Sequence, residues 1–175
     1  MATFKSRAFI GGVPFRAVSE EPFEVTASVL VPNGTAIAAS DVFKFFKLGA
    51  NIRILEATLA VDDLDTGASI TLDLGYDLPT GTDDDDAFLA NSTIGQAGGT
   101  VRVENGGDDP FAVGLLAPQT EVMTVQAKCE AGPAGNPTTD RYLVCSMKCV
   151  QRPAAPTGVE YVYADRYNSS GVGSI

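Results

Sequence analysis

Residues 41–76 read DVFKFFKLGANIRILEATLAVDDLDTGASITLDLGY, and this stretch decides the fold class. In its last part, apolar residues alternate with Thr71, Asp73 and Gly75, which is the period-two pattern of a strand with one buried face and one wet face. A second strand is expected over residues 52–61, where the apolar positions change phase near Leu55. Such a change predicts a β-bulge. The stretch therefore predicts consecutive β-strands.

The two strands are separated by DDLDTG at residues 62–67. Short polar side chains and a glycine supply the turn conformations that a tight reversal needs. We therefore expect a tight turn between these strands.

The chain has 175 residues and a formal net charge of −10. This length suits one domain with a single core, with or without an arm. Because DNA and RNA binding depends on Lys and Arg that neutralise phosphates, the acidic balance and the lack of a basic cluster in the sequence argue against nucleic acid as a partner. No apolar run approaches the roughly 20 residues that span a bilayer, and residues 1–15 lack the apolar core of a signal peptide. We therefore expect no membrane partner and no export.

The sequence contains three cysteines and no histidine. Cys129, Cys145 and Cys149 form no CxxC pair, so neither a disulfide framework nor a zinc site is predicted, and we interpret them as small buried hydrophobes. On strands, Cys145 and Cys149 share a face, and Cys129 faces them across a hairpin. The lack of histidine removes Ser-His-Asp and Cys-His catalysis and the commonest metal ligand.

Strands are also predicted on both sides of the deciding stretch. We expect strands over residues 23–31, 41–48, 100–104 and 111–116, a short helix over 87–95, and a closing hairpin of two long strands over 121–130 and 141–151. About eight strands at this spacing predict an all-β fold, an antiparallel β-sandwich of jelly-roll-like type. The expected domains are an N-terminal arm with one strand at 1–40, the β-sandwich at 41–152 and a C-terminal tail at 153–175.

Aromatic residues mark both ends of the chain. An extended arm with aromatic anchors docks either on its own domain or on a neighbouring subunit. The candidate contact residues are Phe4, Phe9 and Phe15 in the arm and Tyr161, Tyr163 and Tyr167 in the tail.

The sharpest short motif is LDTGAS at residues 64–69, which resembles the active-site loop of retroviral-type aspartic proteases. In that family two such loops, one from each subunit of a dimer, bring two carboxylates together. The resemblance implies a dimeric retropepsin-like protease that uses Asp65. However, Asp62 and Asp63 stand where the family has apolar residues, and Asp-Thr-Gly is also ordinary turn chemistry. The turn interpretation is favoured, and no catalytic residue is assigned.

Residues 83–86 are four consecutive aspartates, whose carboxylate oxygens are the ligands that a hard cation such as calcium prefers. Consecutive aspartates do not reproduce the alternate-position spacing of a calcium loop. A solvated acidic loop is the favoured interpretation, so we predict no metal site and no cofactor.

Several segments together resemble small structural proteins of tailed-bacteriophage particles, particularly head-decoration (cement) proteins of the β-sandwich type. The matching segments are DVFKFFKLGANIRILEATL, the reversal with DxDTGA, SITLDLGY and, after the acidic loop, DAFLANSTIGQAGG. The closing strands TEVMTVQAKCEAG and DRYLVCSMKCV fit the same pattern, so the resemblance covers most of residues 41–150. It consists of strand and turn patterns, without a catalytic signature.

The resemblance implies a non-enzymatic virion structural protein that binds the outer surface of a phage head and stabilises it. Its partners would be the major capsid protein of the same particle and further copies of itself, as a homotrimer at a three-fold site of the lattice. It would be made in the host cytoplasm and located on the capsid surface. A tail or fibre component is the alternative within this class, and the dimeric aspartic protease is the alternative outside it.

Overall fold

The structure, a computed structural model, describes residues 1–10, 22–104 and 120–151. These residues form nine strands, the short helix α1 (Arg7–Ile10) and the 3-10 helix η1 (Ile94–Gln96). No helix within these ranges is long and apolar enough to cross a membrane. In chain order the strands are β1 (Thr3–Lys5), β2 (Phe23–Val31), β3 (Val42–Leu48), β4 (Ile52–Val61), β5 (Thr71–Asp77), β6 (Asp84–Ser92), β7 (Gly99–Glu104), β8 (Met123–Ala131) and β9 (Arg141–Gln151).

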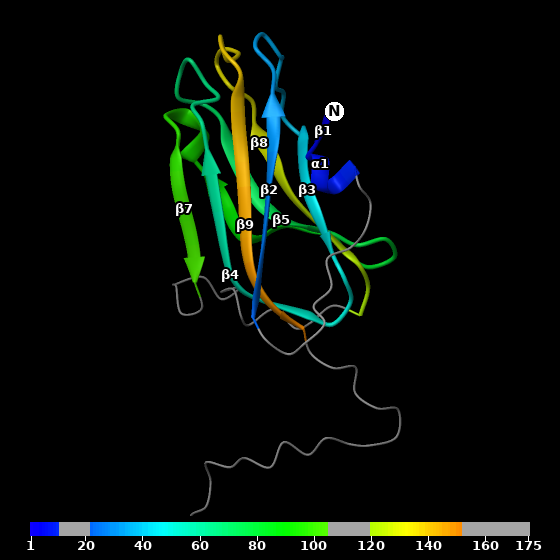
Figure 1. The fold of residues 1–175 in the computed structure, drawn as a ribbon. Helices are drawn as coiled ribbons and strands as arrows, with labels where there is room; N and C mark the ends of the chain where they lie inside the picture. Colours follow the sequence, from blue (N-terminus) through cyan, green and yellow to red (C-terminus); the bar gives the residue numbers. More distant parts are fainter. Residues whose placement is uncertain (11–21, 105–119, 152–175) are drawn as a thin grey trace, which may run out of the picture.

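The strands form two sheets that pack face to face (Figure 1). One sheet has five strands in the order β1-β3-β8-β5-β6, and the other has four in the order β2-β9-β4-β7. The described pairs are antiparallel except β1 with β3. Because β2 pairs with β9, β3 with β8, β4 with β7 and β5 with β6, the chain is arranged as a long hairpin rolled into two sheets, which is a jelly roll. The predicted all-β sandwich is confirmed.

Local sequence patterns placed several strands at their observed bounds. β2, β4 and β9 occupy the predicted ranges, and inward positions of β2 are buried while outward ones are exposed. The register of β4 on β9 shifts between Ile54 and Glu56, which confirms the predicted bulge. An alternating segment rich in β-branched residues suits a strand with one buried face, whatever its neighbours are.

Two predicted connections are wrong. β4 lies in the four-stranded sheet and β5 in the five-stranded sheet, so residues 62–70 cross between sheets and do not form a tight hairpin turn. β8 and β9 also lie in different sheets and form no hairpin. Among the described strands, only β5 and β6 are both consecutive and paired. Periodicity reveals a strand's buried face, but it does not reveal the strand's partner.

The predicted helix over residues 87–95 is also wrong, because residues 84–92 form β6 and only η1 is helical there. Ala87 and Phe88 are buried, and the register of β6 on β5 is interrupted twice. β6 therefore begins inside the acidic run that the sequence predicted to be a loop.

The core lies between the two sheets, and its largest fully buried side chains include Phe43, Phe45, Phe46 and Phe88. Burying a side chain of this size stabilises the fold by about 1.5–3 kcal/mol relative to leaving it exposed. Leucine and isoleucine side chains from both sheets complete the interior. The sandwich is thus held mainly by apolar burial.

The three cysteines are buried in this core as free thiols, which confirms their interpretation as small hydrophobes. Cys129 lies on the five-stranded sheet, whereas Cys145 and Cys149 lie on the four-stranded sheet, so they are not hairpin neighbours. Burial raises the pKa of Cys129 to about 11 and that of Cys149 to about 12. These two thiols therefore remain protonated at neutral pH.

β5 differs from the half-wet strand predicted from its alternation. Asp73 and Gly75, expected on the wet face, are both buried. A side chain at Gly75 would meet backbone atoms of Asp84 and Asp85. The first residues of β6 therefore lie against the outer face of β5.

We expect Gly75→Ala to lower the free energy of unfolding by about 1–3 kcal/mol, measured by urea denaturation, because the added methyl group overlaps backbone that cannot rotate away. Gly132→Ala is the matched control, since the carbon added there has its nearest neighbour at an ordinary 3.4 Å. Equal stability of the two variants would contradict this placement of β6 against β5.

Candidate functional site

Asp65, the residue singled out by the protease-like motif, lies in the connection between β4 and β5 and is only 3% exposed. Its Oδ1 accepts the N–H of Gly67 at 2.8 Å. Its Oδ2 accepts the N–H of Ser69 at 2.8 Å, the hydroxyl of Ser69 at 3.1 Å and the N–H of Ile70 at 3.0 Å. The carboxylate therefore fixes the conformation of its own loop.

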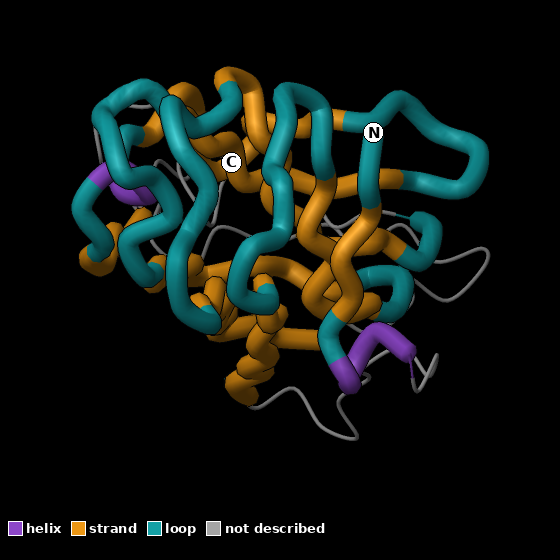
Figure 2. Tube along the Cα trace, turned by 90° about the horizontal axis from the view of Figure 1, so that it is seen from above, coloured by secondary structure: helices purple, strands orange, loops and turns teal. Residues whose placement is uncertain are grey.

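The same carboxylate reaches the connection between β8 and β9. Its Oδ1 also accepts the N–H groups of Ala134 and Gly135, at 2.8 and 3.2 Å. Both connections cross from one sheet to the other at the same end of the sandwich, which Figure 2 views from above. Asp65 thus ties two sheet-crossing connections together.

Burial alone would raise the pKa of Asp65, but the N–H donors of Ser69, Gly67 and Ile70 favour the charged form and hold its pKa well below the ordinary value. The carboxylate stays ionised at neutral pH, and backbone donors occupy its acceptor positions. The dyad of an aspartic protease needs two carboxylates that share a proton and activate water. The geometry supports the turn interpretation of this motif.

Residues 1–10 dock on the chain's own five-stranded sheet. β1 runs parallel to β3, and the rings of Phe4 and Phe43 are stacked with centroids 5.0 Å apart. Asp41 is buried and accepts the backbone N–H groups of Ala2 and Ala38. The sequence left open whether the arm docks on its own domain or on a neighbouring subunit. Residues 1–10 dock on their own domain, where Phe4 packs against the core.

Ser6 connects β1 to α1. Its hydroxyl donates to the carbonyl of Phe45 and accepts the N–H of Phe9 at 2.9 Å, so it caps the first turn of α1. This turn holds Phe9 beside β3 on the outside of the sheet.

The ring of Phe9 is surrounded by three lysines. Their Nζ atoms lie 5.5 Å (Lys5), 6.0 Å (Lys44) and 5.3 Å (Lys47) from its centroid, within the range of cation–π attraction. We call Phe9 and these lysines the basic patch. The linear sequence shows no basic cluster because two of the lysines come from β3 and one from β1. Lys44 and Lys47 lie on either side of a shift in the register of β3 against β8. The sequence pattern of this strand did not predict that shift.

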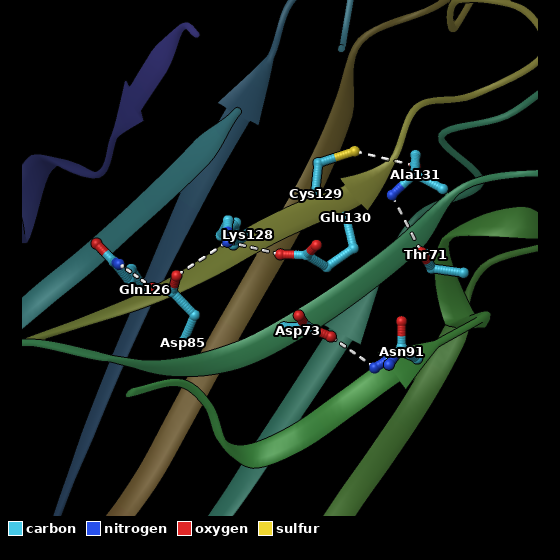
Figure 3. A network of polar contacts seen from close by, with 9 residues as sticks. All are labelled: Thr71, Asp73, Asp85, Asn91, Gln126, Lys128, Cys129, Glu130 and Ala131. Atoms are coloured by element: carbon cyan, nitrogen blue, oxygen red, sulfur yellow. Dashed lines mark hydrogen bonds and ion pairs between the residues drawn. The ribbon is translucent and has the colours of Figure 1, made fainter. Parts of the chain in front are cut away.

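A groove at the other half of the five-stranded sheet is strongly acidic, and we call it the acidic groove. Lys128 lies between Asp85 and Glu130, with Nζ 3.0 and 2.7 Å from their carboxylate oxygens (Figure 3). Hydrogen bonds to Glu130 and Asp85 raise the pKa of Lys128. The groove is lined by Asp73, Asp83, Asp84, Asp85, Asp86, Asn91, Lys128 and Glu130.

The carboxylates of this groove crowd one another. Desolvation raises the pKa of Asp84, and a hydrogen bond and the negative charge of Asp86 raise it further. Burial raises the pKa of Asp73, which the charges of Glu130 and Asp86 reinforce. Across the described ranges, no group of cysteine and acidic side chains is arranged to hold a metal ion.

Four of the six candidate contact residues, Phe15, Tyr161, Tyr163 and Tyr167, lie outside the described residues, as does the predicted strand over 111–116. The structure brings the other two, Phe4 and Phe9, to the same edge of the five-stranded sheet. Strand β2, within the range predicted as an arm, is an edge strand of the four-stranded sheet.

The sequence matches no known family profile and no curated protein. Solved structures include a chain in the capsid of Ralstonia phage GP4, with 29% identity, a TM-score of 0.69, and 87% of this chain and 100% of that chain covered. A chain in the capsid asymmetric unit of cyanophage Pam1 shares the fold, with 20% identity, a TM-score of 0.61, and 81% of this chain and 92% of that chain covered. The structural neighbours are therefore chains of phage capsids, which confirms the resemblance to phage-particle proteins.

We expect Asp65→Asn to lower the free energy of unfolding at pH 7 by about 2–4 kcal/mol, because an amide cannot accept all of the N–H groups that the carboxylate binds. Since the pKa of Asp65 is lower in the folded chain than in the unfolded chain, its stabilising contribution is complete above about pH 4 and is lost as the pH falls through the folded pKa. The difference between parent and variant should therefore shrink below about pH 4.

Urea denaturation at several pH values measures this difference. Asp63→Asn is the matched control, because Asp63 accepts one backbone N–H, that of Asp65, and its loss should cost less than about 1 kcal/mol. An Asp65→Asn variant as stable as its parent but without a proteolytic activity of the parent would reverse this assignment in favour of the protease.

Proposed function

We propose that the chain is a structural protein of a phage particle and that it acts as a decoration (cement) protein on the outer surface of the head. The observation that carries this proposal is the match to a chain of a solved phage capsid over the whole length of that chain. The match covers the complete sandwich and not only a fragment of it. This favours a chain that is itself a virion component over a chain that shares only part of its fold with one.

The physical properties of the described unit suit this role. A protein that clamps a shell must fold by itself and hold its contact surfaces rigidly across the joints between shell subunits. Here the apolar core and the tie at Asp65 provide a rigid body. The net charge of −10 favours solubility before the protein is attached to the particle.

The stabilising mechanism is binding linkage. A protein that binds the assembled shell and not its dissociated subunits shifts the equilibrium toward the shell. This role requires affinity and rigidity, and it requires no reaction.

The proposed partners are the major capsid protein of the same particle and further copies of this chain. A homotrimer would match a three-fold site of an icosahedral lattice. Phe9 and Phe15 of the arm and the tyrosines of the tail, Tyr161, Tyr163 and Tyr167, remain the candidate contacts. Deleting residues 1–20 would not test the arm cleanly, because β1 and Phe4 belong to the sheet and its core.

The test is co-sedimentation with undecorated heads of the phage that encodes the chain. We expect saturable binding to the heads and an increase in the temperature at which the heads come apart, because the bound protein stabilises only the assembled shell. Heads that pellet without the protein at every concentration would contradict the proposal.

The same assay tests the tail as an anchor. We expect the triple variant Tyr161→Ser, Tyr163→Ser, Tyr167→Ser to bind heads at least about tenfold more weakly, because aromatic side chains commonly dominate binding energy. Tyr142→Ser is the matched control, since Tyr142 is a 47% exposed tyrosine on the outer face of the four-stranded sheet. If the triple variant binds as tightly as Tyr142→Ser, the tail is not the anchor.

A further inference from the structure

The basic patch contains cations that the described part of the chain leaves without a carboxylate partner. Lys44 forms an ion pair with Asp77 at 2.8 Å. Within the described ranges, no ion pair involves Lys5 or Lys47, whose ammonium groups pack only around the ring of Phe9. In a chain with a net charge of −10, such a concentration of positive charge marks a surface that is available to an acidic partner.

The acidic groove has the opposite imbalance. Six carboxylates line it together with one ammonium group, that of Lys128, which already bridges Asp85 and Glu130. Asp86 is exposed at this groove, and the carboxylates around it repel one another. A cationic partner would relieve this repulsion.

The patch and the groove share the outer face of the same sheet. Lys44 is the register partner of Gln126 on β8, and Gln126 donates its Nε2–H to Asp85 at 3.0 Å. On the opposite face, Phe43 and Ala127 are register partners and fully buried in the core. In this sheet only β8 lies between β3, which carries Lys44 and Lys47, and β5, which carries Asp73. One sheet face thus carries both signs of charge, in separate halves.

We propose that this face is a contact between copies of the chain, in which the basic patch of one copy docks on the acidic groove of a second copy. The occupant follows from charge complementarity, since each half supplies the charge that the other lacks. The patch also offers the half-buried ring of Phe9, which the contact would cover. The proposal deepens the self-association named above and rests on that part of the proposed function.

The contact joins two different surfaces, so it is heterologous. Repetition of a heterologous contact gives a closed ring when its rotation closes, and three copies satisfy a three-fold site. Each copy would then use its patch toward one neighbour and its groove toward the other.

The experiment is a charge swap followed by sedimentation equilibrium of the full chain at low and high salt. We expect the parent to associate at about 0.05 M salt and to dissociate progressively toward about 0.5 M, because screening weakens the attraction. Lys47→Glu and Asp86→Lys should each weaken association about tenfold or more, since each places like charges opposite one another. The variant that carries both substitutions should recover to within about threefold of the parent, because opposite charges face each other again.

Lys148→Glu and Glu24→Lys are the matched controls, because they change the net charge equally but lie on the four-stranded sheet. We expect them to associate as the parent does. Circular dichroism and thermal unfolding confirm that each variant is folded. The proposal is overturned if the parent is a monomer at low salt, if the controls weaken association as much as Lys47→Glu does, or if the double variant is no better than the single ones.

Head co-sedimentation is independent of this measurement. A chain that binds heads but stays monomeric in solution at low salt overturns this contact and leaves the proposed function standing. A chain that self-associates with the predicted charge dependence but does not bind heads supports this contact and overturns the proposed function.

Discussion

The fold depends on how the chain closes one end of the sandwich, where the connections over residues 32–41, 62–70 and 132–140 cross between the sheets. Asp65 holds the second of these to the third through N–H groups of both. The first is joined to the third by the N–H of Gly34, which donates to the carbonyl of Pro137 at 3.1 Å. A jelly roll has few connections within a sheet, so the crossing connections must fix the position of one sheet on the other. A buried, ionised carboxylate surrounded by backbone donors does this without a partner cation.

Local chemistry was sufficient to predict most strands from the sequence. The alternation of β2 and the phase change near Leu55 in β4 are properties of neighbouring residues, and both appear in the structure. Strand pairing joins residues far apart in the chain, such as Val31 with Arg141, so it left no local pattern and the predicted hairpins were wrong. β6 was missed because three of its residues are aspartates, which are depleted in strands, yet Asp85 is held there by Gln126 and Lys128.

In the candidate site, too, contacts between residues near in the sequence could be predicted, whereas contacts between distant residues could not. The turn chemistry around Asp65 could be read locally, whereas its bonds to residues 134 and 135 could not. The basic patch was missed because folding gathers Lys5 of β1 and Lys47 of β3 around Phe9. The outcome is one sheet face with separated charges above a closed apolar core, and the proposed contact between copies would use this separation of charge. The fold itself is shared with chains of phage capsids.

Cryo-electron microscopy of the complete phage particle tests this account most directly. We expect density for the sandwich of β1 to β9 on the outer surface of the head, with the basic patch of each copy facing the acidic groove of its neighbour. A head map without this sandwich, or a sandwich found only in the tail, would contradict the account.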